Sequence, residues 1–107
     1  MDHFLNWRDF EGSRPDKFFK SSLWQGKNIM LGLNCLEPGQ SQPVHAHKGT
    51  DKFYFVLSGR GSFTVGDELK EAAEGSIVVA PAEIPHGVSN LSNERLTLLV
   101  GMAPPVK

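Results

Sequence analysis

The apolar segments of this sequence are short, because eleven glycines and seven prolines interrupt its 107 residues. Between these turn residues lie runs rich in β-branched, aromatic and aliphatic side chains, a composition typical of strands. The runs are 29–35, 53–57, 62–65, 77–80 and 96–100. Two of them alternate between apolar and other residues, whereas 53–57 is continuously apolar and predicts a strand buried on both sides.

Helical signals are weak by comparison. Residues 69–74 contain helix formers, but six residues between a turn and a glycine are too few for a stable helix. Residues 2–12 could form one helical turn before Pro15. The sequence therefore predicts an all-β fold, with strands joined by tight turns into a sandwich or a barrel.

The composition excludes several classes of protein. A hydrophobic content of 39% and a net charge of -1 are ordinary for one globular domain. The sequence also lacks the excess of basic residues that is typical of proteins that bind nucleic acids. Cys35 is the single cysteine, so no intrachain disulfide is possible. The apolar runs are too short to span a bilayer, and the N-terminus lacks the pattern of a signal peptide. We therefore expect a cytoplasmic protein with no membrane partner.

Three of the four histidines are candidates for a metal site. His45 and His47 are separated by one residue, and side chains two apart in a strand project from the same face. His86 follows Pro85, in a loop stiffened by proline. Neutral imidazole is the commonest metal ligand, although a lone histidine is more often an ordinary surface or core residue. His3 has no supporting context, and we expect it to be exposed.

The residues around these histidines form two ordered groups. The first comprises Gly39, His45, His47, Asp51, Lys52 and Gly59, and the second comprises Gly75, Pro81, Glu83, His86 and Asn90. In order and spacing they resemble the two motifs of the cupin superfamily, over residues 39–90. The three glycines fall where strands are expected to reverse, and such turns often require a positive φ.

The resemblance implies a small single-domain (type 2) cupin, which is a double-stranded β-helix or jelly-roll barrel. Residues 1–107 would form one domain, with 1–27 as the N-terminal segment and first strand and 28–101 as the barrel core. His45, His47 and His86 would bind a divalent metal ion, either Fe, Mn, Zn or Ni. The family also commonly forms homodimers, so the resemblance implies a homodimer here.

Two positions depart from the family pattern, and one of them is Glu83, which stands where the second motif usually has a glycine. The first motif usually ends in a metal-binding glutamate, but this chain has Asp51 and Lys52 there. Three interpretations follow. The three histidines bind metal alone, with Lys52 pointing away or paired with Asp51; or a local bulge makes Asp51 the fourth ligand. Alternatively, Lys52 takes the glutamate's place in a metal-free site, where its lowered pKa suits a base or an anion anchor.

Two functional hypotheses remain open. In the first, the protein is an enzyme of dioxygenase or isomerase type acting on a small organic molecule, with Lys52 and Tyr54 as candidate catalytic residues. We expect an apolar or aromatic substrate, because we expect an apolar pocket. The expected lining is Phe53 or Tyr54, Phe55 or Val56, Phe63, Ile77, Val79 and Leu98. In the second, the chain is a non-catalytic module that binds a small ligand, either with a metal ion or metal-free with Lys52 in its pocket.

Overall fold

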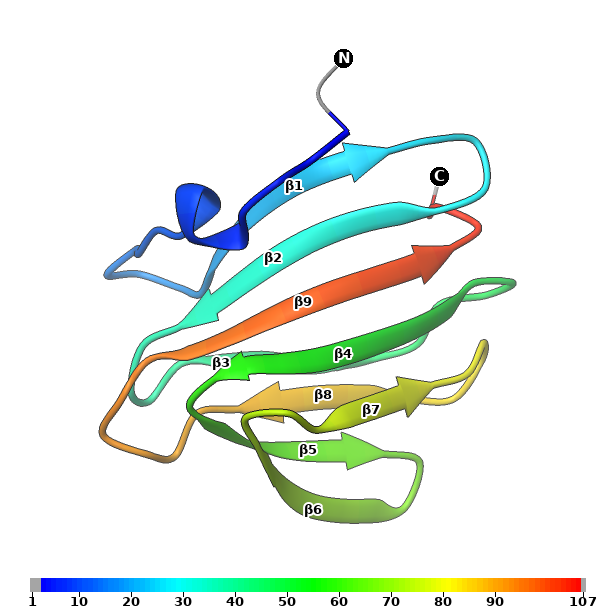
Figure 1. Cartoon of the computed structure of the whole chain (residues 1–107). Coiled ribbons are helices and arrows are strands. Elements are labelled where there is room, and N and C mark those ends of the chain that lie inside the picture. The colour runs from blue at the N-terminus through cyan, green and yellow to red at the C-terminus, as the bar shows by residue number, and fades with distance from the viewer. Residues whose placement is uncertain (1–2, 107) are drawn as a thin grey trace.

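The structure is a computed structural model that describes residues 3–106. Within that range, a short 3-10 helix η1 (Trp7–Phe10) is followed by nine strands (Figure 1). The strands are β1 (Phe19–Gln25), β2 (Met30–Leu36), β3 (Ser41–His45), β4 (Asp51–Ser58), β5 (Arg60–Val65), β6 (Glu68–Ala73), β7 (Ile77–Ala80), β8 (His86–Ser89) and β9 (Leu96–Ala103). The predicted all-β jelly-roll barrel is confirmed. Residues 69–74 lie mostly in β6, and the predicted helical turn is η1.

Two antiparallel sheets form the barrel. One has the strand order β1-β2-β9-β4-β7 and the other has the order β3-β8-β5-β6. The last strand, β9, lies between β2 and β4, and it pairs Leu99 with Leu33 on one side and with Phe55 on the other. Within residues 3–106, no helix is long and apolar enough to cross a membrane.

Alternation along β4 separates the inside of the barrel from the outside. Lys52, Tyr54 and Val56 are buried and face the interior, whereas Phe53 and Phe55 are only half-buried on the outer face. The prediction that both faces of 53–57 are buried is therefore wrong, since only one sheet face meets the core. The core is built from inward-facing apolar residues of both sheets. These are Leu36, Tyr54, Val56, Phe63, Val88, Leu96, Leu98, Val100 and Met102.

One end of the barrel is closed by a tight turn and a buried amide. Gly59, between β4 and β5, has a φ of +84°, and a Cβ there would lie 2.4 Å from the carbonyl oxygen of Arg95. Only glycine fits both conditions. Gly39 and Gly75 also have positive φ, as predicted. Asn90, fully buried just after β8, bonds to the backbone of Leu36 across the same end.

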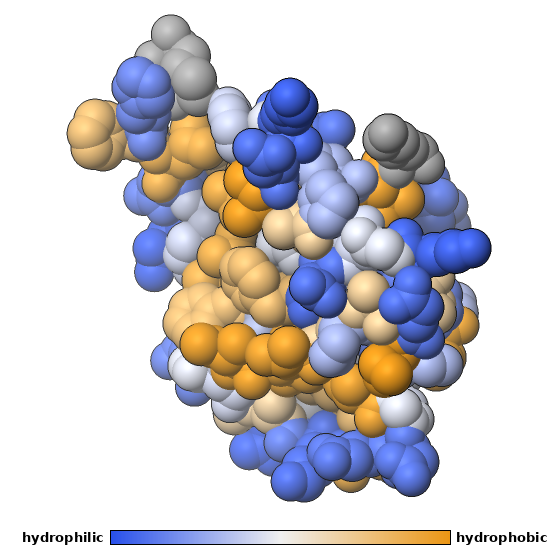
Figure 2. Space-filling view, turned by 90° about the vertical axis from the view of Figure 1, so that its right-hand side faces the viewer, coloured by the Kyte–Doolittle hydropathy of each residue, from blue (hydrophilic) through white to orange (hydrophobic). Residues whose placement is uncertain are grey.

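The outer face of the five-stranded sheet is covered only in part. Leu33 and Cys35 are fully buried there, and Glu11 of the N-terminal segment accepts a hydrogen bond from Thr97 at 3.3 Å. At the β7 edge of the sheet the face is open, with Ile77 and Val79 exposed to 66% and 60%. Figure 2 looks onto the end of the barrel where β4 begins and shows hydrophobic residues gathered along one flank. The homodimer remains a prediction.

Candidate metal site

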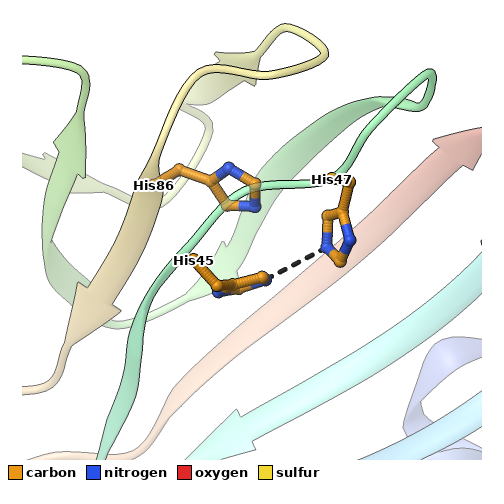
Figure 3. A group of neighbouring side chains, drawn as sticks. All are labelled: His45, His47 and His86. Atoms are coloured by element: carbon orange, nitrogen blue, oxygen red, sulfur yellow. Dashed lines mark hydrogen bonds between the residues drawn. The ribbon is translucent and has the colours of Figure 1, made fainter.

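Three histidines from two segments meet at the end of the barrel where β4 begins. His45 is the last residue of β3 and pairs in register with His86, the first residue of β8. His47 lies two residues beyond β3, in the loop to β4. Figure 3 shows the three rings turned toward one another, and one ligand atom of each lies within 4.8 Å of the others. The structure thus brings together the three histidines that the sequence singled out.

Backbone carbonyls fix two of these rings. His45 Nδ1 lies 2.8 Å from the carbonyl oxygen of Pro43, and His86 Nδ1 lies 3.0 Å from that of Ile84. A carbonyl oxygen can only accept, so both Nδ1 atoms carry the proton and donate. In the neutral ring each Nε2 is then left with a lone pair, which is the arrangement that metal-binding histidines adopt.

The Nε2 atoms show where those lone pairs point. His45 Nε2 lies 3.1 Å from His47 Nε2, the contact drawn in Figure 3, and one of these nitrogens must be an acceptor. His86 Nε2 is buried and has no hydrogen-bond partner among the described residues. Three nitrogens bound to one tetrahedral zinc ion, at about 2.0–2.1 Å each, would lie roughly 3.3–3.4 Å apart, and the His45–His47 separation is close to that value.

The surroundings favour the neutral form of His47 and His86. Burial, reinforced by the charges of His45, Lys52 and His86, lowers the pKa of His47 to about 4. Burial also lowers the pKa of His86, against the effect of its bond to the Ile84 carbonyl. Neutral imidazole is the form that binds metal, so neither group needs to lose a proton at neutral pH.

Lys52 is the residue of the unusual pair that faces the barrel interior. It is only 5% exposed, and its ammonium lies 3.5 Å from Gln42 Oε1 and 4.6 Å from the centre of the Tyr54 ring. Burial, followed by repulsion from Lys20, lowers the pKa of Lys52 to about 8. A cation thus occupies the position expected for the glutamate.

Asp51 is not brought into the histidine group. Asp51 and Lys52 pair regularly with β9, and the irregularity of this ladder lies further along, between Val56 and Ser58. Without a bulge the exposed Asp51 points away from Lys52, and its carboxylate accepts a hydrogen bond from the backbone of Ala82 at 2.9 Å. It thereby anchors the loop that leads to His86.

Tyr54 lies behind the histidines. It is fully buried, its ring centre is 6.2 Å from that of His86, and its hydroxyl donates a hydrogen bond to Gln42 Oε1. Burial raises the pKa of this hydroxyl. Tyr54 therefore remains protonated, and its hydroxyl bonds to the same Gln42 oxygen that accepts from Lys52.

Glu83 replaces the glycine usual in the second motif. Its φ of 68° is the left-handed conformation that glycine adopts most easily. Its backbone N–H donates to the carbonyl of His47 at 2.8 Å, and its carboxylate accepts from the Gly49 N–H at 3.2 Å. The exposed Glu83 thus ties together the two loops that carry His47 and His86.

A cavity of about 420 Å³ adjoins His45 and His47. Its lining is Lys20, Ser21, Ser22, Met30, Gly32, Asn34, Gln42, His45, His47, Lys52, Val100, Met102 and Val106. The predicted lining is wrong: Ile77 and Val79 face outward, and Phe63 and Leu98 are closed within the core. The contributions of β1, β2 and Gln42 were missed because they depend on which strands pair and in which register, which no local pattern specifies.

Comparisons with known proteins agree with this geometry. The profile of the family described as "Cupin domain" matches residues 32–102. An uncharacterised protein of Streptomyces coelicolor is 42% identical over 81 residues, which are 74% of this chain and 73% of that protein. A crystal structure from Thermus thermophilus has a TM-score of 0.93 at 37% identity, covering 96% of this chain and 98% of its own. An RmlC-like cupin from Desulfovibrio desulfuricans has a TM-score of 0.87 at 28% identity, covering 99% and 100%.

Proposed function

The chain belongs to the cupin family, and on this premise we propose that it binds a divalent metal ion through His45, His47 and His86 and acts on a small molecule in the adjoining cavity. The candidate ions are iron, zinc and nickel, which suit imidazole ligands, and manganese, which the resemblance to other cupins adds. A metal held by three histidines retains open positions, at which it supplies Lewis-acid or redox chemistry to a bound molecule.

The observation that carries this proposal is the unpartnered Nε2 of His86. Buried polar atoms nearly always have a hydrogen-bond partner, and one without a partner costs about 1–3 kcal/mol. His86 is 1% exposed, its Nδ1 is held by a carbonyl, and its Nε2 faces two further imidazoles. A metal ion would satisfy this nitrogen and its neighbours together.

The protein's own residues position the ligands and close the site. The carbonyls of Pro43 and Ile84 hold two rings in the tautomer that presents Nε2, and Glu83 ties the two ligand-bearing loops. Such supporting contacts are needed to fix ring orientation. Lys52 would orient a bound molecule from the cavity side, because its ammonium faces the same space.

A second candidate is supported by Lys52 itself. A buried cation beside three imidazoles opposes the binding of a divalent cation. In this alternative the chain is a metal-free module that binds a small ligand without chemistry. The two candidates differ in one measurable property, which is metal affinity.

The test is a zinc titration by calorimetry on protein purified without a chelating tag, with elemental analysis of the protein as isolated. We expect one zinc ion per chain, and strong weakening in His45→Ala but not in the matched control His3→Ala, which changes an exposed histidine. Lys52→Glu should bind zinc about tenfold or more tightly, because a repelling cation becomes a fourth ligand. Equal, negligible zinc binding by the wild type and His45→Ala would overturn the metal proposal.

A further inference from the structure

The charges around the cavity are all of one sign. Two lysines, Lys20 and Lys52, line it, and the lining contains no aspartate or glutamate. The two ammonium groups lie close enough that Lys20 lowers the pKa of Lys52. A cavity with this charge pattern favours an anion over a neutral or cationic molecule.

Lys52 lacks a counter-charge. Among residues 3–106, no carboxylate lies within ion-pair distance of its ammonium. The group can donate three hydrogen bonds, but among residues 3–106 it makes only one long hydrogen bond, to Gln42, and one contact with the face of the Tyr54 ring. Gln42 Oε1 already accepts the Tyr54 hydroxyl. Burying a cation with so little compensation is unfavourable, so the ammonium is left to pair with a group that comes from outside the chain.

The other residues that line the cavity indicate the chemistry of the rest of the ligand. Asn34, 5% exposed, and Ser21 add neutral hydrogen-bonding atoms. Met30, Val100 and Met102 form an apolar wall beside Lys52. A volume of about 420 Å³ is within the range of small-ligand pockets. A ligand that fits has one compact anionic end and a modest apolar body.

We propose that the cavity binds a small organic carboxylate whose carboxylate group pairs with Lys52 and whose apolar body lies against Met30, Val100 and Met102. This substrate class rests on the proposed function, since it names what is presented to the metal. A carboxylate fits better than a phosphate, because only one buried ammonium serves the anion, whereas phosphate sites supply several N–H donors to several oxygens.

The test uses benzoate as the probe and benzamide as its neutral isostere. Binding is measured by calorimetry on the full chain, both metal-free and zinc-loaded, for the wild type and Lys52→Met. We expect benzoate to bind the wild type at least tenfold more tightly than benzamide, and Lys52→Met to lose about tenfold to a hundredfold of the benzoate affinity. Lys70→Met, which removes an exposed lysine on β6, is the matched control and should bind benzoate like the wild type.

Thermal unfolding separates binding from folding, because benzoate should raise the midpoint of the wild type but not that of Lys52→Met. Equal affinities for benzoate and benzamide, or for the wild type and Lys52→Met, would overturn the proposal. Tighter binding of inorganic phosphate than of benzoate would overturn it as well. Failure of the metal proposal is seen separately, as absent zinc binding, and preferential benzoate binding to metal-free protein would still support the carboxylate site.

Discussion

The two ends of strand β8 carry two buried polar residues that differ in how their polar atoms are satisfied. Asn90, just beyond the strand, donates from Nδ2 to the carbonyls of Leu36 and Glu94 at 2.8 and 2.7 Å. Its Oδ1 accepts from the backbone N–H of Ser92 at 3.0 Å and from the Ser92 hydroxyl at 2.7 Å. His86, at the other end, has one carbonyl partner, and its Nε2 has none among the described residues.

This difference separates a residue that holds the fold from one that is available to bind. Both side chains are at most 1% exposed, so burial alone does not distinguish them. Asn90 uses its two donors and its acceptor oxygen within the chain, and has little capacity left for a ligand. His86 keeps an unshared lone pair beside two other imidazoles. The closed end of the barrel is therefore structural, and the other end is where chemistry can occur.

The largest expected effect is on zinc affinity in His86→Ala. Structural zinc sites release about 10–16 kcal/mol from four ligands, so losing one ligand should remove about 2.5–4 kcal/mol, roughly 60-fold to 700-fold in affinity. The free energy of unfolding of the metal-free protein should fall by only about 1 kcal/mol, because one hydrogen bond is lost and an unpartnered nitrogen disappears with it. Calorimetry and urea unfolding measure the two quantities. If the metal-free protein lost much of its stability while its zinc affinity was unchanged, His86 would be a structural residue like Asn90.

The second effect is on stability in Asn90→Ala. The change removes two bonds to carbonyls and leaves the Leu36 carbonyl with one partner fewer in a buried position, so the free energy of unfolding should fall by about 2–3 kcal/mol. Asn93→Ala, at an exposed neighbour, should change it by less than about 0.5 kcal/mol. Where Asn90→Ala remains folded, its zinc affinity should match the wild type. If Asn90→Ala were as stable as the wild type but bound zinc more weakly, Asn90 would serve binding and not the stability of the fold.

The sequence was sufficient to predict the fold and the histidine group but not the cavity. The strand runs and turn glycines are local signals, and His45, His47 and His86 lie within two ordered motifs. The lining depends instead on non-local pairing: β9 lies between β2 and β4, and β1 lies at the sheet edge beyond β2. No pattern within a single strand indicates which distant strand covers it.

The choice between Asp51 and Lys52 shows the same limit on a smaller scale. Alternation puts the two side chains on opposite faces, but a single bulge would exchange them. The regular ladder with β9 makes Lys52 the inward residue. This ladder forms between segments about fifty residues apart. The residues of the first motif alone therefore could not show which of the two side chains faces inward.

The smallest expected effect is on stability in Lys52→Met. Lys52 is buried at the open end of the barrel with few partners, so it tests whether that end is kept for binding at a cost in stability. Replacing a poorly paired buried charge by an apolar side chain of similar volume is often stabilising, and we expect Lys52→Met to raise the free energy of unfolding at pH 7 by about 1–2 kcal/mol. The lysine pKa is about 8 in the folded protein and about 10.4 in an unfolded chain. Between these values the unfolded state binds more protons, so wild-type stability attributable to Lys52 rises with pH.

The advantage of Lys52→Met should therefore be largest below pH 8 and shrink as the pH approaches 10. Urea unfolding of both proteins at pH 7, 8.5 and 10 measures this difference, with Lys70→Met as the control for loss of a surface charge. A Lys52→Met variant that is less stable than the wild type at every pH would mean that the lysine, like Asn90, holds the fold. A pH-dependent gain would instead mean that the chain retains a destabilising cation, as expected if that cation is kept for a ligand.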